Sequence, residues 1–132
     1  VDAGETADIK TAIPMAASLA EKWHSIVVIS GETDIITDGK KTVLIHNGCP
    51  EMSLITGSGC MCTTVIGAFC GANPEHPLES AAAAMGAMGL AGERAWKDWG
   101  KEGLGHFHMA IIDELGKMTG KSLEQGVRYE EC

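Results

Sequence analysis

The tetrapeptide Gly57-Ser58-Gly59-Cys60 contains the residue types best suited to bind an anion in this sequence of 132 residues. It follows an extended segment and precedes an apolar run, so we expect a tight turn at the start of a helix. Glycines permit such a turn and let a ligand approach the backbone closely. The first amides of a helix have no partner inside the helix and carry partial positive charge, which suits a transferring phosphoryl group.

A cysteine, Cys60, comes directly after this turn. A thiol at a helix N-terminus is expected to have a lowered pKa, and the thiolate is the reactive form. The same residues also fit a simpler interpretation, in which the turn is only structural and Cys60 is a small apolar residue entering a core helix. The tetrapeptide by itself leaves both interpretations open.

The segments before this loop indicate an α/β fold. A helix is predicted over 11–23, where Met15, Leu19 and Trp23 share one stripe. The β-branched run 25–30 is typical of a strand buried on both faces in a parallel sheet. Segments 35–37 and 42–45 predict a β-hairpin joined at Asp38-Gly39.

The segments after the hairpin are predicted to be mainly helical. Residues 52–55 are expected to be a short extended segment, and 60–71 is apolar enough for a buried helix. Further helices are predicted over 78–99 and 107–118. Glycines in the first of these, Gly86, Gly89 and Gly92, are expected where another backbone approaches closely. The polar residues 122–132 are expected to form a peripheral tail.

Composition and charge argue against several classes of protein. The formal net charge is −8 and there is no basic stripe, which argues against nucleic-acid binding by phosphate neutralisation. The most apolar run, 78–92, is interrupted by Glu79 and is too short to span a membrane. The cysteines show no CxxC spacing, and we interpret them as reduced thiols of a cytoplasmic protein. They are Cys49, Cys60, Cys62, Cys70 and Cys132.

An ordered set of motifs resembles hydroxyethylthiazole kinase, an enzyme of thiamine salvage in the ribokinase-like superfamily. The resemblance covers nearly the whole chain. The motifs are VVISGETDIITDG at 27–39, HNG at 46–48, ITGSGC at 55–60, VIGAF at 65–69 and GLGHF at 103–107. The resemblance implies the three-layer αβα fold of this superfamily, with residues 1–132 forming the C-terminal part of the kinase domain.

The resemblance also implies a reaction and its residues. The family transfers the γ-phosphoryl group of ATP to the hydroxyl of 4-methyl-5-(2-hydroxyethyl)thiazole. Cys60 would be the catalytic residue, since most ribokinase-like kinases have an Asp base there. Gly57, Ser58 and Gly59, with the Cys60 amide, would form the anion hole, and Gly57 would also lie against the substrate. Ser30 would contact ATP where the family has Thr. His106 stands where the family has Ser or Thr, and we assign it no role.

Two other interpretations are compatible with the sequence. A nucleotide-hydrate dehydratase shares the superfamily, but such enzymes keep Asp at the position of Cys60. A non-catalytic fragment or subunit piece is the other, because the family has about twice this length and the chain opens without Met at 1–5. The N-terminal half would supply the Mg²⁺ ligands and most of the parallel sheet, so the chain alone is expected to be at most weakly active.

The resemblance further implies a homotrimer, with a separate chain carrying the N-terminal half as an open alternative. No metal ligand is assigned within this chain. Asp34 and Asp38 are the acidic candidates, and both are better explained as turn-forming residues.

Overall fold

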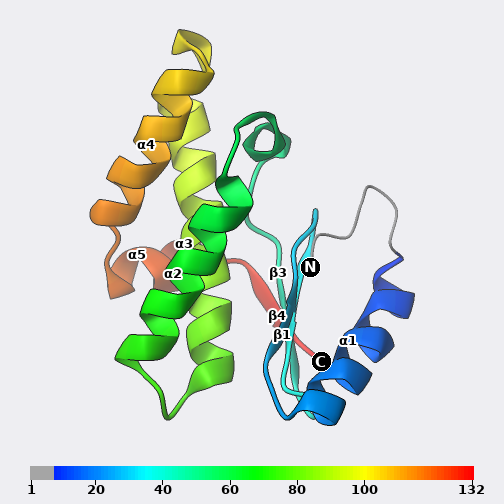
Figure 1. The fold of residues 1–132 in the computed structure, drawn as a ribbon. Coiled ribbons are helices and arrows are strands. Elements are labelled where there is room, and N and C mark those ends of the chain that lie inside the picture. Colours follow the sequence, from blue (N-terminus) through cyan, green and yellow to red (C-terminus); the bar gives the residue numbers. More distant parts are fainter. Residues whose placement is uncertain (1–7) are drawn as a thin grey trace.

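The computed structural model describes residues 8–132, which form layers of helices on both faces of one sheet (Figure 1). Helix α1 (Ile9–Trp23) covers one face. Helices α2 (Ser58–Ala72) and α3 (Pro77–Trp99) cover the other, and α4 (Leu104–Gly116) packs on the outer side of α3. The predicted α/β fold with helices on both faces of a sheet is confirmed. The segment 1–5, which led us to expect a fragment, lies outside the described residues.

The sheet has four strands in the order β1-β2-β3-β4. They are β1 (Val27–Ile29), β2 (Asp34–Thr37), β3 (Thr42–Ile45) and β4 (Tyr129–Glu131). Each neighbouring pair is antiparallel. The parallel neighbour predicted for 25–30 is therefore not found among residues 8–132. A continuous apolar run indicates that both faces of a strand are covered, but it does not determine whether the adjacent strand is parallel or antiparallel.

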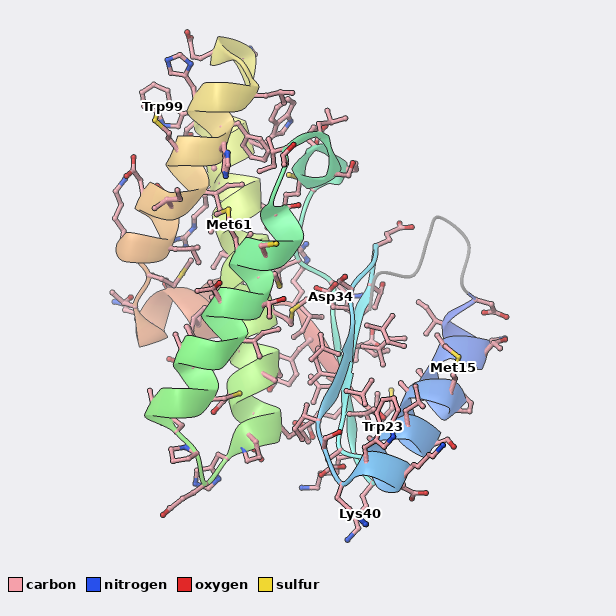
Figure 2. The ribbon with its side chains drawn as sticks, viewed as in Figure 1. Met15, Trp23, Asp34, Lys40, Met61 and Trp99 are labelled. Carbon is pink, nitrogen blue, oxygen red and sulfur yellow. The ribbon has the colours of Figure 1, made fainter. Side chains whose placement is uncertain are left out.

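All four residues of β2 are buried. Because successive side chains of a strand point to opposite sides, both faces of β2 are covered. Ile35 packs with Ala12 and Ala16 of α1, whereas Ile36 packs with Leu78 and other residues of α3. The side of α1 that is buried against the sheet consists of alanines, while Met15 and Trp23, from the predicted apolar stripe, are exposed (Figure 2). The helix is where the pattern placed it, but it packs through its smaller side chains.

The predicted hairpin joins β2 to β3 through a wider turn than the Asp-Gly signal implied. Thr37 pairs with Thr42, so residues 38–41 make the connection. The Asp38 carboxylate accepts hydrogen bonds from the amides of Lys40 and Lys41, each 2.8 Å long. These bonds confirm the turn-forming role predicted for Asp38, and they lower the pKa of its carboxyl.

The predicted buried helix begins at Ser58, and no residue of it is buried. One side of α2 rests on the core through Cys62, Ile66 and Cys70. Small residues such as Gly59 and Gly67 line the exposed side, and a Cβ at either would meet nothing within 4 Å. The prediction of burial was wrong because apolar composition does not show whether a neighbouring element lies on the second side.

Two further segments, one before α2 and one at the end of the chain, differ in their secondary structure from what the sequence indicated. Of residues 52–55 only Ile55 is extended, since Pro50–Leu54 form a 3₁₀ helix, η1, and proline favours the first turn of a helix. The tail 122–132 is peripheral, since none of its residues is buried, but it is regular, with most of helix α5 (Gly120–Gly126) and strand β4. All three residues of β4 are exposed, as suits a charged edge strand, and this polarity concealed the strand in the sequence.

A polar network joins this tail to α3 and to the loop after β3. The Arg128 guanidinium donates to both carboxylate oxygens of Glu93, at 2.6 and 3.3 Å, and to the carbonyl of His46 at 2.6 Å. Partial burial alone would raise the pKa of Glu93, but the bonds from Arg128 and the Gly48 amide outweigh it and lower that pKa. Buried Asn47 accepts from the amide of Arg128 at 2.7 Å and donates to the Gly126 carbonyl at 3.0 Å.

The loop after β3 lies close to α3, and this close approach makes the network possible. A Cβ added at Gly89 would lie 2.7 Å from the carbonyl carbon of Asn47, so only glycine lets this backbone pass. The predicted close approach of another backbone is thus confirmed at Gly89. At Gly86 and Gly92 the close neighbours are side chains, those of Val127 and Met52.

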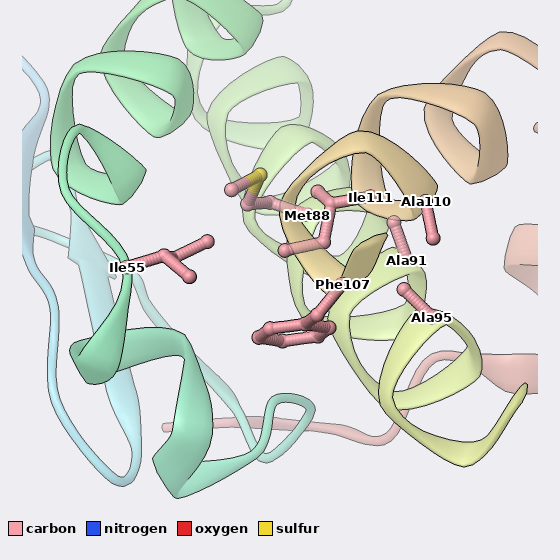
Figure 3. Close-up of a cluster of buried hydrophobic side chains, with 7 residues drawn as sticks. All are labelled: Ile55, Met88, Ala91, Ala95, Phe107, Ala110 and Ile111. Atoms are coloured by element: carbon pink, nitrogen blue, oxygen red, sulfur yellow. The ribbon is translucent and has the colours of Figure 1, made fainter. Parts of the chain in front are cut away.

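The main apolar cluster lies between α3 and α4 (Figure 3). Phe107 is fully buried there, and its ring forms a T-shaped pair with that of Trp96, with centroids 5.1 Å apart. Ile55, which follows η1, closes the same cluster. Within residues 8–132 no helix is long and apolar enough to cross a membrane.

We predict that Asn47→Ala lowers the free energy of unfolding by about 2–3 kcal/mol, because it removes a buried side chain and leaves the amide of Arg128 and the carbonyl of Gly126 without their side-chain partner. Chemical denaturation measures this change. Asn73→Ala is the matched control, since Asn73 is exposed and its side chain donates only to Phe69. We expect a change within about 0.5 kcal/mol for the control. Equal effects of the two substitutions would contradict the role of Asn47.

Candidate functional site

The start of α2 presents backbone amides that the helix itself does not use. Gly57 precedes the helix, and no side chain caps this end. The first amide bonded within the helix is that of Met61, which donates to the Gly57 carbonyl at 2.9 Å. The amides of Ser58, Gly59 and Cys60 therefore precede the hydrogen-bonded ladder and point out of the positive end of the helix dipole. The turn and the free amides expected at this helix start are present, and their role as an anion hole stays a prediction.

The two glycines of the loop have different roles. Gly57 has φ +88°, a left-handed conformation that other residues adopt at a cost of about 1–2 kcal/mol. Gly59 is helical, and a Cβ there would meet nothing within 4 Å. Nothing in the described chain therefore requires glycine at position 59, whereas a ligand that approaches the amides from outside would require it.

Cys60 is exposed at this helix end, whereas Cys49, Cys62 and Cys70 are partly buried. Burial raises the pKa of Cys49 to about 11, with a further contribution from Glu51. Burial likewise raises the pKa of Cys62 to about 11, and the charge of Asp34 adds to this effect. These two thiols remain protonated at neutral pH. The role of Cys60 as a base stays a prediction.

Ser30 lies at the end of β1, on the side of the sheet that faces α2. Val28 of the same strand packs with Ile36 in the cluster between the sheet and α3, and alternation puts Ser30 on the same face. In Figure 1 the β1–β2 turn and the start of α2 lie at the same end of the molecule. Among residues 8–132 no hydrogen bond joins Ser30 to the 57–60 loop, so the two are placed independently.

Asp34 lies between these two parts of the candidate site, and sequence reasoning missed its importance. It opens β2, is only 6% exposed, and accepts a hydrogen bond from the Gly31 amide at 3.0 Å. It shares the α2-facing side with Ile36, and its charge acts on Cys62 (Figure 2). Its capping of the turn agrees with the predicted role, but its burial does not. The signal in the sequence was a carboxylate that directly begins an apolar, β-branched run.

The described residues do not complete a catalytic pocket around the loop. Across 8–132, no group of three or more His, Cys, Asp or Glu side chains could hold a metal ion. A hollow of about 390 Å³ is lined by Trp96, Lys97, Gly100 and Lys101, and another lies beside His24 and Pro77. Neither is lined by residues 57–60. His106 stacks on Trp99 with centroids 6.3 Å apart, which explains its presence without a catalytic role.

Comparison with known proteins agrees with this arrangement. The family model described as the hydroxyethylthiazole kinase family matches residues 1–121. The hydroxyethylthiazole kinase of Clostridium beijerinckii is 42% identical over 135 residues, which cover 99% of this chain and 48% of that protein. The enzyme of the same name from Ruminiclostridium cellulolyticum is 38% identical, with the same coverage. The chain spans about half the length of these curated relatives.

A solved structure shares the fold. It is that of a hydroxyethylthiazole kinase protein from Pyrococcus horikoshii, with a TM-score of 0.85 and 25% sequence identity. The match covers 93% of this chain and 47% of that one. Because the family model matches well over half of the sequence, the chain belongs to the hydroxyethylthiazole kinase family.

Proposed function

We propose that the full-length protein transfers the γ-phosphoryl group of ATP to the hydroxyl of 4-methyl-5-(2-hydroxyethyl)thiazole. The observation that carries the proposal is the uncapped start of α2, where Gly57 turns the chain and three amides face outward in a chain of this family. Relatives that match 99% of the chain bear the name of this activity.

In the proposed reaction the alcohol oxygen forms a bond to the γ-phosphorus, while the bond from that phosphorus to the oxygen of the leaving ADP breaks. Negative charge on the phosphoryl oxygens is stabilised by the amides of Ser58, Gly59 and Cys60. Catalysis of this kind depends mainly on positioning and on charge stabilisation.

Cys60 is proposed to interact with the hydroxyl group of the alcohol, either as a base or as a hydrogen-bond donor. As a thiolate it would accept this proton, and as a thiol it would hydrogen-bond the alcohol oxygen and orient it. Little base strength is needed when the transition state is loose. The exposed position of Cys60 at the helix end leaves it accessible to the alcohol.

Ser30 is proposed to contact ATP from the end of β1. Mg²⁺, when bound, neutralises phosphate charge in phosphoryl transfer. The described residues contain no group suited to hold it, so we assign it no ligand here. The remaining half of the protein is proposed to supply those ligands and to close the pocket over the loop, with this chain as the C-terminal part of the domain. Assembly as a cytoplasmic homotrimer stays a prediction.

We predict that Cys60→Ala in the full-length protein lowers kcat for the thiazole alcohol by about tenfold or more, while the Kd for ATP changes little. Steady-state kinetics and calorimetry measure these two quantities. Cys132→Ala is the control, because Cys132 is the other exposed cysteine. A wild-type protein unable to phosphorylate this alcohol would refute the proposed function, and unchanged kcat in Cys60→Ala would leave Cys60 with only a structural role.

Gly59→Ala separates function from stability. Alanine favours a helix over glycine by about 1 kcal/mol, so we expect the melting temperature to be maintained or raised. The added methyl group would stand among the outward amides, and we expect kcat to fall by about 10²-fold, the loss typical of one anion-hole donor. Gly67→Ala, also exposed on α2, should keep its activity. Full activity in Gly59→Ala would show that no ligand approaches this turn.

A further inference from the structure

The turn between β1 and β2 is held by two contacts, one to the Asp34 carboxylate and one to the His46 ring. Ile29 pairs with Ile35 in the last rung between these strands, and Asp34 opens β2, so residues 30–33 form the connection. Gly31 is exposed within it, and its amide donates to the buried Asp34 carboxylate at 3.0 Å. The position of this amide also fixes the peptide plane that follows Ser30.

A second contact holds the other side of the same turn. The Thr33 hydroxyl and Nδ1 of His46 are 3.3 Å apart. His46 is held in turn by its neighbours on the tail, since its amide donates to the Arg128 carbonyl at 2.9 Å. Nε2 of His46 lies 3.4 Å from a carboxylate oxygen of Glu130, close enough for an ion pair if His46 is protonated but without hydrogen-bond geometry. The turn is therefore fixed at both ends.

Folding stability alone does not explain a carboxylate at position 34. Burial raises the pKa of Asp34 to about 6, against which the bond from Gly31 acts more weakly. A carboxyl group whose pKa is higher in the folded than in the unfolded protein costs stability at neutral pH, because the folded state favours the protonated form. No cation pairs with Asp34 among the described residues, and its charge contributes to the raised pKa of the Cys62 thiol.

We propose that Asp34 is a positioning residue for the nucleotide. By accepting the Gly31 amide, it holds the β1–β2 turn so that Ser30 is presented on the face of the sheet toward the start of α2. This role rests on the proposed function, in which Ser30 contacts ATP. The proposal explains why a carboxylate is buried between the turn after Ser30 and helix α2, whose start is the proposed anion hole.

Substitutions that separate the hydrogen bond from the charge test this role in the full-length protein. Asp34→Ala removes the acceptor, and we expect the Kd for ATP to rise about tenfold, while kcat at saturating ATP and the KM for the thiazole alcohol stay within about twofold. Asp34→Asn keeps an oxygen that can accept from Gly31, and we expect it to retain wild-type affinity. Asp38→Asn is the matched control, since Asp38 caps the other turn of β2.

Each outcome bears on the proposal. Unchanged ATP affinity in folded Asp34→Ala would overturn it, as would an equal loss in Asp34→Asn, which would make the charge and not the hydrogen bond decisive. Equal rises in Kd for ATP and KM for the alcohol would show general disruption and also overturn it. If Asp34→Ala does not fold, Gly31→Pro removes the same bond from the donor side and should raise the Kd for ATP.

The test distinguishes this proposal from the proposed function. A wild-type protein that binds ATP but does not phosphorylate the thiazole alcohol refutes the function, and the effect of Asp34 on ATP affinity is still measured. A wild-type protein that does not bind ATP refutes both.

Discussion

Close contact between α3 and the loop that follows β3 is the constraint on which the rest of the structure depends. Gly89 lets the backbone of Asn47 lie directly against the helix. Asn47 then binds the tail on one side, while Glu93 binds the amide of Gly48 on the other. A side chain at position 89 would separate these elements, and the sheet would lose the anchor of its last strand.

The same contact determines where the candidate site begins. The chain leaves Gly48, forms η1, and buries Ile55 in the cluster between α3 and α4 before it turns at Gly57. The outward amides of α2 are therefore supported by a packed segment although the loop itself is exposed. On the sheet, Asp34 gives comparable support to the turn after Ser30. Each of the two parts of the candidate site is thus held by contacts within this chain.

Local sequence signals predicted the elements well where they coincided with strong physical preferences. Glycine at position 57 fits a left-handed turn, Asp38 caps the hairpin, and the order of motifs identified the family. The signals failed where the outcome depends on distant partners. The tail 122–132 has too few apolar residues for a strand to be predicted there, and β4 forms because it pairs with the edge of β3. The pairing of Glu93 with Arg128 joins residues 35 positions apart, which no local pattern reveals.

Burial was the other property that the sequence could not give. The apolar helix α2 was expected in a core and is covered on one side only, whereas Asp34 was expected in a turn and is almost fully buried. Both outcomes follow from the tertiary arrangement, since exposure depends on which elements pack together and not on composition. Asp34, whose interpretation changed in this way, lies beside the residues of the candidate site.

The most direct test is an experimental structure of the full-length protein with a non-hydrolysable ATP analogue and the thiazole alcohol. We expect oxygens of the γ-phosphate, or of the group that replaces it, about 3 Å from the amides of Gly59 and Cys60. The alcohol oxygen should lie beside the Cys60 sulfur. A terminal phosphate bound elsewhere, for example in the hollow beside Lys97 and Lys101, with the start of α2 left free, would contradict the assignment of this loop as the site of phosphoryl transfer.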